Sequence, residues 1–215
     1  ILICSTNSPS TMVPWGSREK YFGTNPICIS VPTKGNPIIL DMATSVVARG
    51  KILLAEKKGV PIPEGWAIDI EGRPTTDASA ALTGSVLPFG GPKGSGIAMM
   101  VDIISGVLSG SGFGIHMNYP FANLDKCMET GHCFIAIDIA QIRPLEEFFN
   151  DIDKMVSEIK GLQPAAGIDE IFVPGELEFN SRNNKLNEGI NIPKVVFEEL
   201  KVFANQSDIA FDIQN

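Results

Sequence analysis

The segment from Gly90 to Gly96 surrounds one lysine, Lys93, with glycines and leads directly into a helical pattern. Glycines let the backbone approach a ligand, the first amides of a helix lack partners, and the lysine adds a positive charge. The segment therefore predicts an anion-binding loop; a glycine-rich turn with a solvated lysine is the alternative. It is neither a Walker loop nor a dinucleotide fingerprint, because Lys93 precedes Gly94 and Met99 stands where the third glycine belongs.

Three further segments are candidates for ligand contact. Asp41–Ser45 runs from a strand into an expected helix, and open α/β sheets bind ligands at strand ends, although a simple helix cap also accounts for it. In Gly23–Pro26 the proline is expected to restrict Asn25 to extended geometry, but a turn that positions the next strand is the favoured account. Residues 173–176 (Val-Pro-Gly-Glu) form either an ordinary turn or a corner facing a ligand, and both interpretations stay open.

The histidines and cysteines point to no metal site. His116 and His132 have the side chain best suited to proton transfer near neutral pH, but neither has an orienting carboxylate beside it, so a structural role is predicted for both. Cys4 and Cys28 lie in apolar runs and are expected to be buried thiols, whereas the spacing of Cys127 and Cys133 fits no zinc pattern. These features favour a reducing, cytoplasmic compartment.

The elements that position these residues alternate between short strands and helices, which indicates an α/β or α+β fold. The expected strands are Leu2–Ser5, Ile27–Val31, Pro37–Leu40, Trp66–Asp69, Cys133–Asp138 and Glu170–Val173. The expected helices follow Asp41 and end at Lys57-Lys58-Gly59, run from Gly94 to Gly110, run from Pro144 to Lys160-Gly161, and follow Pro193. Residues 61–92, rich in proline, glycine and threonine, are predicted to be a long surface connection near a site.

Composition limits the classes of partner. The 215 residues carry a net charge of −8, which disfavours nucleic acid and anionic membranes. The apolar stretch from Gly96 to Met117 is interrupted by Asp102 and predicts a buried helix rather than a membrane span. Because the chain opens on an apolar strand, Ile1-Leu2-Ile3-Cys4, without methionine, we expect a further N-terminal portion in the natural protein.

An ordered set of motifs spans the whole chain. It comprises Ser5-Thr6-Asn7, Met12-Val13-Pro14-Trp15-Gly16, Phe22-Gly23-Thr24-Asn25-Pro26, Leu40-Asp41-Met42-Ala43-Thr44-Ser45, Ala48-Arg49-Gly50-Lys51, Ile62-Pro63-Glu64-Gly65-Trp66-Ala67, Gly72-Arg73-Pro74-Thr75-Thr76-Asp77, the glycine-lysine loop, the helix end at Gly106–Gly110, and Pro174-Gly175-Glu176. In this order the set resembles the type 2 malate/L-lactate dehydrogenase family, which also contains ureidoglycolate, sulfolactate, diketogulonate and piperideine-carboxylate oxidoreductases.

The resemblance implies a malate/L-lactate (sulfolactate) dehydrogenase-like α/β fold that is not a Rossmann fold, with a mixed sheet flanked by helices. Residues 1–215 would form the cofactor-binding core and the C-terminal part. It also implies NAD or NADP as cofactor, a small 2-hydroxy/2-oxo acid as substrate, and a homodimer. Matches to the family's cofactor contacts are Asn7, Ser8, Asp41, Met42, Ala43, Thr44, Lys93, Gly94, Pro174, Gly175 and Glu176.

The sequence departs from the family in two respects. The catalytic histidine and a substrate-binding arginine are expected in an N-terminal portion that this sequence does not contain, and Ser95 stands where an aromatic residue is common. The leading hypothesis is an NAD(P)-dependent oxidoreductase, of malate type by family prevalence. The alternatives are a truncated, non-catalytic nucleotide-binding or dimerisation module, and a phosphate-ester-binding protein that uses the Lys93 loop.

Overall fold

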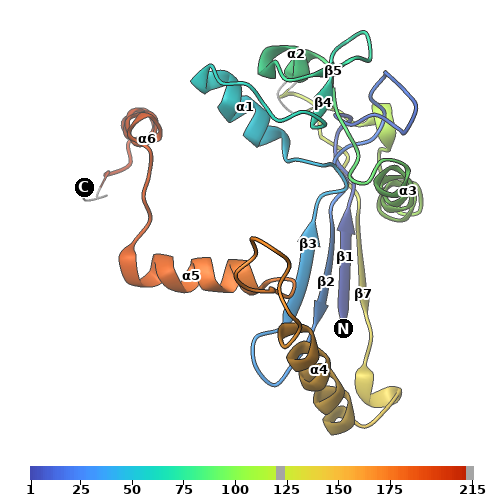
Figure 1. Cartoon of the computed structure of the whole chain (residues 1–215). Coiled ribbons are helices and arrows are strands. Elements are labelled where there is room, and N and C mark those ends of the chain that lie inside the picture. The colour runs from blue at the N-terminus through green and yellow to red at the C-terminus, as the bar shows by residue number, and fades with distance from the viewer. Residues whose placement is uncertain (120–123, 212–215) are drawn as a thin grey trace. The chain divides into compact units, whose positions relative to one another are not determined.

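A computed structural model of the chain describes residues 1–119 and 124–211. It divides into two units, Ile1–Gly175 and Glu176–Asn215. The first unit contains a four-stranded antiparallel sheet in the order β3-β2-β1-β7 (Figure 1). Its strands are β1 (Leu2–Thr6), β2 (Ile27–Val31), β3 (Ile38–Met42) and β7 (His132–Ala136).

The register of this sheet separates two sets of side chains. Ile3 pairs with Ile29 on β2 and with Ile135 on β7, whereas Cys4 pairs with Cys28, which in turn pairs with Asp41. Because successive residues of a strand point to opposite faces, the isoleucines lie on one face and the two thiols and the carboxylate on the other.

The connection predicted over residues 61–92 contains regular structure of its own. It forms a second antiparallel sheet, in the order β5-β4-β6, and a short helix. The elements are β4 (Ala67–Ile68), β5 (Pro74–Thr75), α2 (Ala78–Thr83) and β6 (Ser85–Val86). Together with α1 (Arg49–Lys58) they enclose the buried core around Met12, Ile52 and Val86.

The helix expected from Gly94 to Gly110 begins earlier and changes type. Pro92 opens α3 (Pro92–Val101), as suits a residue without an N–H, and a π-helix follows from Asp102 to Val107. Asp102, Ser105 and Gly106 of this wider turn are buried. The helix as a whole is not buried as predicted, because Met100, Val107 and Leu108 are half or more exposed. Apolar spacing alone does not distinguish the two helix types, so no sequence pattern predicts the π-helix.

Two predicted elements were wrong. Asp41 caps no helix, because β3 continues through Met42 in register with Ile27, and α1 begins only at Arg49. Its predicted end is confirmed: Gly59 adopts the left-handed conformation at the C-cap. Residues 170–173 are not a strand; the carbonyl of Pro174 merely accepts a hydrogen bond from the amide of Ile39, at 3.0 Å.

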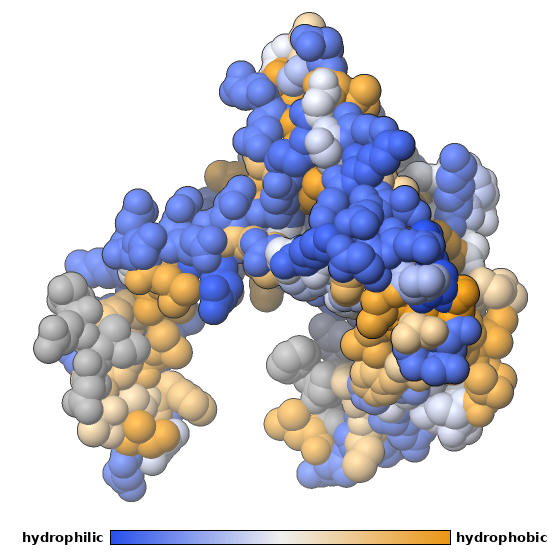
Figure 2. All heavy atoms as spheres, turned by 90° about the horizontal axis from the view of Figure 1, so that it is seen from below, coloured by the Kyte–Doolittle hydropathy of each residue, from blue (hydrophilic) through white to orange (hydrophobic). Residues whose placement is uncertain are grey.

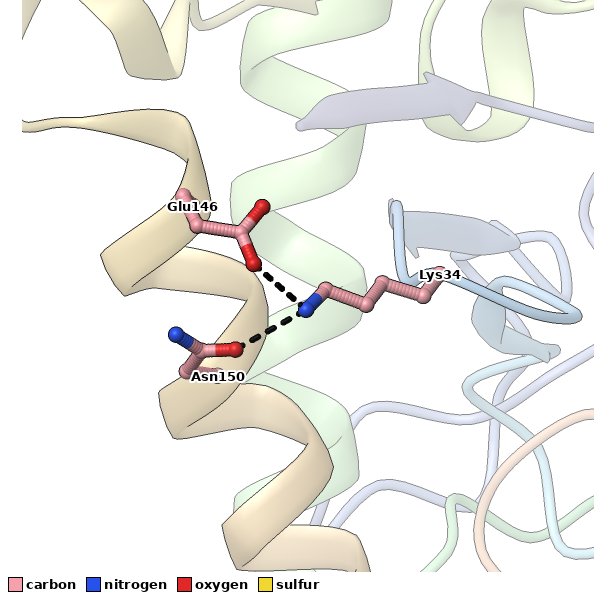
Figure 3. A network of polar contacts seen from close by, with 3 residues as sticks. All are labelled: Lys34, Glu146 and Asn150. Carbon is pink, nitrogen blue, oxygen red and sulfur yellow. Dashed lines mark hydrogen bonds and ion pairs between the residues drawn. The ribbon is translucent and has the colours of Figure 1, made fainter.

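The helix predicted after Pro144 is α4 (Leu145–Lys160), closed by Gly161. Lys34, in the turn between β2 and β3, donates to Glu146 at 2.7 Å and to Asn150 at 2.9 Å on this helix (Figure 3). The hydrogen bond to Glu146 raises the pKa of the Lys34 ammonium, and the residual burial of Lys34 opposes this shift.

The second unit consists of α5 (Glu176–Glu188), which was not predicted, and α6 (Lys194–Gln206), which was expected after Pro193. The ring of Phe197 on α6 packs edge-on against Phe211, 5.1 Å away. Short 3-10 turns at Gly114–His116 and Ile139–Gln141 complete the described elements. None of the described helices has both the length and the apolar character of a membrane span.

Candidate functional site

Asn25 connects two of the predicted ligand segments. Its side chain is fully buried, accepts a hydrogen bond from the amide of Ser8 at 3.1 Å, and donates to the carbonyl of Ala98 in α3 at 2.9 Å. Gly23 permits this arrangement, because a Cβ there would lie 2.1 Å from the carbonyl oxygen of Ser8. The extended geometry predicted for Asn25 was wrong, because its φ is +32°. The segment Gly23–Pro26 is nevertheless more than a turn: it holds the Asn7-Ser8 segment against α3.

Thr44 connects the end of β3 to the glycine-lysine loop. Its amide and its hydroxyl both donate to the carbonyl of Thr24, each at 2.8 Å, and its carbonyl accepts from the amide of Phe89 at 3.1 Å. The carbonyl of Phe89 accepts in turn from Gly94 at 3.0 Å, where a Cβ would lie only 2.3 Å away. The structure thus brings together two segments that are fifty residues apart in the sequence.

Of the other residues predicted to contact the cofactor, Met42 and Ala43 lie at the end of β3, whereas Pro174 and Gly175 lie near its start. Met42, the last residue of the strand, pairs with Ile27, and Ala43 follows it half-buried. Pro174 contacts Ile39 near the start of β3, and Gly175, at φ +92°, packs against the same residue. Glu176 is the first residue of the second unit.

The first turn of α3 differs from the expectation of free amides. The amides of Lys93, Gly94 and Ser95 donate to the carbonyls of Gly90, Phe89 and Gly91 at 3.4, 3.0 and 3.2 Å. An anion at this place would therefore be held mainly by the side chain of Lys93, which is exposed and makes no ion pair with the part of the chain that the structure describes. The helix dipole still favours negative charge here.

Trp15 is an aromatic residue that the sequence reasoning did not single out. Its ring packs on Gly91, where a Cβ would come within 3.0 Å, yet 63% of its surface remains exposed. The backbone amide of Trp15 donates to the hydroxyl of Ser95 at 2.9 Å. Ser95, which stands where the resemblance implies an aromatic residue, therefore anchors the loop that carries Trp15.

A largely apolar groove of about 410 Å³ lies between α3 and the isoleucine face of the four-stranded sheet. Pro92, Lys93 and Gly96 line it from the helix, and Ile3 and Ile135 from the strands. Figure 2 shows hydrophobic side chains gathered at the lower right of its view. The lysine charge thus borders an apolar surface.

Asn7 occupies the centre of a buried polar network. Both hydrogens of its amide group are used, one towards Asp102 at 3.1 Å and one towards the carbonyl of Gly112 at 2.7 Å, while its oxygen accepts from the amide of Gly131 at 2.9 Å. The other carboxylate oxygen of Asp102 accepts from Gly114 at 2.9 Å. Only Ser8, of the predicted Asn7-Ser8 pair, therefore retains an accessible side chain.

Burial raises the pKa of the Asp102 carboxyl, and the hydrogen bonds from Asn7 and Gly114 oppose that shift. Gly106 makes room for the network, because a Cβ there would lie 2.5 Å from the Asn7 side-chain nitrogen. No pattern in the sequence pointed to this network, since its members are separated by about a hundred residues.

Neither histidine is oriented by a carboxylate within the described residues. His116 contacts the ring of Phe113 edge-on at 5.1 Å, and His132 stacks on Phe134 at 6.3 Å. Both side chains are exposed. The described residues contain no cluster of histidine, cysteine, aspartate and glutamate that could hold a metal ion.

The sequence profile of the malate/L-lactate dehydrogenase family matches residues 1–201. The chain belongs to this family. One relative in the family, the L-sulfolactate dehydrogenase of Methanocaldococcus jannaschii, is 41% identical over 204 residues, which cover 95% of this chain and 58% of the relative. The NADP-dependent (2R)-3-sulfolactate dehydrogenase of Chromohalobacter salexigens is 38% identical over 206 residues, covering 95% and 59%.

Solved structures of family members agree with this assignment. The malate dehydrogenase of Entamoeba histolytica superimposes with a TM-score of 0.91 at 26% identity, covering 99% of this chain and 63% of the other. The predicted α/β fold of malate/sulfolactate dehydrogenase type is thereby confirmed. The expected mixed sheet was wrong, because the strands of both described sheets pair antiparallel. The chain spans somewhat less than three fifths of the length of the sulfolactate dehydrogenases it matches.

Proposed function

We propose that this chain provides the cofactor-binding core of an NAD(P)-dependent oxidoreductase that acts on a small 2-hydroxy/2-oxo acid, with malate as the expected hydroxy acid. The observation that carries the proposal is the convergence of three segments, the Ser8 segment, the Thr44 strand end and the Lys93 loop, through Asn25 and Phe89. The names of the relatives, which include NADP- and NAD-dependent dehydrogenases, support it.

The residues present fit a dinucleotide through charge and shape. The exposed ammonium of Lys93 suits a phosphate, and the apolar groove beside it suits a flat ring. The cofactor, when bound, supplies or accepts the hydride. The chain's own part is to fix the cofactor's orientation, because correct positioning accounts for much of the rate of such transfers.

Binding is tested directly on this chain by titrating NADH and NADPH and following their fluorescence. Replacing Lys93 by methionine removes one charged contact, which is worth about 1.5–3 kcal/mol. We therefore expect binding about 10- to 100-fold weaker. Lys51→Met on α1, which removes an equally exposed charge, is the matched control and leaves the dissociation constant unchanged. Equal affinities for both variants and the parent would remove the proposed cofactor site.

Turnover is tested separately, by NADH oxidation with oxaloacetate, pyruvate and 3-sulfopyruvate, together with the intact mass of the protein. Preference for oxaloacetate would support the malate assignment, and preference for 3-sulfopyruvate would replace it. Tight cofactor binding without turnover of any 2-oxo acid would favour a non-catalytic binding module. Variants His116→Asn and His132→Asn should retain whatever turnover the chain has, since no carboxylate among the described residues orients either imidazole.

A further inference from the structure

Two of the four cysteines face each other across neighbouring strands. Cys4 on β1 and Cys28 on β2 are direct register partners in the antiparallel sheet. Opposed residues in such a ladder have Cα atoms about 4.5 or 5.5 Å apart, depending on the type of pair. Both values lie within the range of roughly 4.4–6.8 Å that a disulfide requires. Both thiols are free and half-buried.

The other two cysteines have no comparable partner. Cys133 on β7 is paired with Ser5, so its side chain is on the opposite face of the sheet from Cys4, and Cys127 is exposed in a loop. The surroundings of Cys28 reduce the fraction of its thiol that is deprotonated at neutral pH, because they raise its pKa. Burial, then the charge of Asp41, then Cys4 raise the pKa of its thiol.

We propose that Cys4 and Cys28 form an oxidation site that closes to a cross-strand disulfide when the protein meets a peroxide. One thiolate attacks a peroxide oxygen, so that the O–O bond breaks, the sulfur becomes a sulfenic acid and hydroxide leaves. The second thiolate then attacks that sulfur, forming the S–S bond and expelling the second hydroxide. In sum, the two thiols lose two electrons and two protons, and hydrogen peroxide becomes two waters.

The disulfide would join the first two strands next to the end of β3. Cys28 lies between Cys4 and Asp41 across three adjacent strands, and Asp41 belongs to the strand end that we propose for cofactor contact. Cβ atoms of opposed residues are about 4.5–5.5 Å apart, whereas a disulfide needs about 3.5–4.5 Å. The strands must therefore move together slightly, which makes the bond easier to reduce than an unstrained one.

The test uses the full chain with Cys127 and Cys133 both replaced by serine, so that only the proposed pair remains. After treatment with hydrogen peroxide and quenching, the remaining thiols are alkylated under denaturing conditions and the intact monomer is weighed. The expected result is a monomer that has lost two hydrogens, takes up no alkylating group, and takes up two after reduction with dithiothreitol.

Two further samples give the outcomes that would overturn the proposal. The same protein with Cys4→Ser in addition should remain singly alkylatable at low peroxide, because Cys28 then has no partner. The parent chain, digested after oxidation, should yield a peptide linking residues 4 and 28. Continued alkylation of both thiols in the paired protein, a link between Cys127 and Cys133 in the parent, or a disulfide found only between two chains would each refute the site.

Because thiolate is the reacting form and the Cys28 pKa is raised, closure should be faster at pH 9 than at pH 7. This readout does not involve cofactor binding. Failure of the disulfide test therefore leaves the proposed function untouched, and failure of cofactor binding leaves the oxidation site untouched.

Discussion

Replacing Asn7 by alanine should be among the most destabilising single changes in the chain. The side chain is 1% exposed, and its loss leaves three buried groups short of a partner: the amide of Gly131, the carbonyl of Gly112 and one oxygen of Asp102. Each such group costs about 1–3 kcal/mol. Taking the lower half of that range, about 1–2 kcal/mol, for each of three groups that relax in part, we expect a loss of about 3–6 kcal/mol in the free energy of unfolding.

A loss of that size is a large fraction of the roughly 5–15 kcal/mol that stabilises a typical domain. It is measured by urea unfolding followed by far-ultraviolet circular dichroism, with Asn36→Ala as control, since Asn36 is exposed in a turn and its change should cost less than about 0.5 kcal/mol. A loss below about 1 kcal/mol for Asn7→Ala, with an unchanged slope against urea, would refute the role given to this network.

The remaining predictions concern pH, space and surface charge. The pKa of Asp102 is raised, so its contribution to stability is complete below the unfolded pKa of about 4 and is lost as pH rises through the folded pKa. The stability of the parent, measured against that of Asp102→Asn, should therefore decline as pH rises. If the urea midpoints of the two proteins change in parallel from pH 4 to 8, this prediction is wrong. Gly94→Ala forces a Cβ against the carbonyl of Phe89, which costs about 1–3 kcal/mol and should lower the melting temperature by several degrees. The control is Gly96→Ala, which has open space around the new Cβ and should leave the melting temperature unchanged or raise it. Lys34→Met should not shift the urea midpoint measurably at high salt, because its ion pair is exposed.

Local sequence patterns predicted which helices and strands exist better than they predicted the residues at which these elements begin and end. The first, second and third strands and the helix after Pro144 are confirmed, because alternation and a proline at the helix start are local signals. The boundary at Asp41 was misread because a carboxylate suits a helix cap as well as an edge strand. The change at Asp102 from α- to π-helix has no local signal, and the buried polar residues of the π-helix, Asp102 and Ser105, bond to Asn7 and Ser5, about a hundred residues away.

The candidate site shows the same contrast between local features, which sequence patterns predict, and long-range contacts, which they do not. Lys93 and the end of β3 were identified from residue type and position, but their connection through Phe89 was not. For Asn25 sequence reasoning favours an ordinary turn, because its two partners, Ser8 and Ala98, lie 17 and 73 residues away and no local pattern indicates them. Long-range hydrogen bonds of this kind leave no periodic signal in a single sequence, so a motif can be recognised without its structural role.

The strand order of the main sheet has a consequence for folding during synthesis. β1 lies inside the sheet, between β2 and β7, although β7 follows it by 126 residues. Once the residues up to Met42 have left the ribosome, β1, β2 and β3 can pair as a local meander. The other edge of β1, however, stays open until residues 132–136 have emerged. At roughly 5–20 residues per second that interval lasts several seconds. An unpaired strand edge invites association with other chains. Nascent-chain pull-down should therefore find chaperones on intermediates ending before β7.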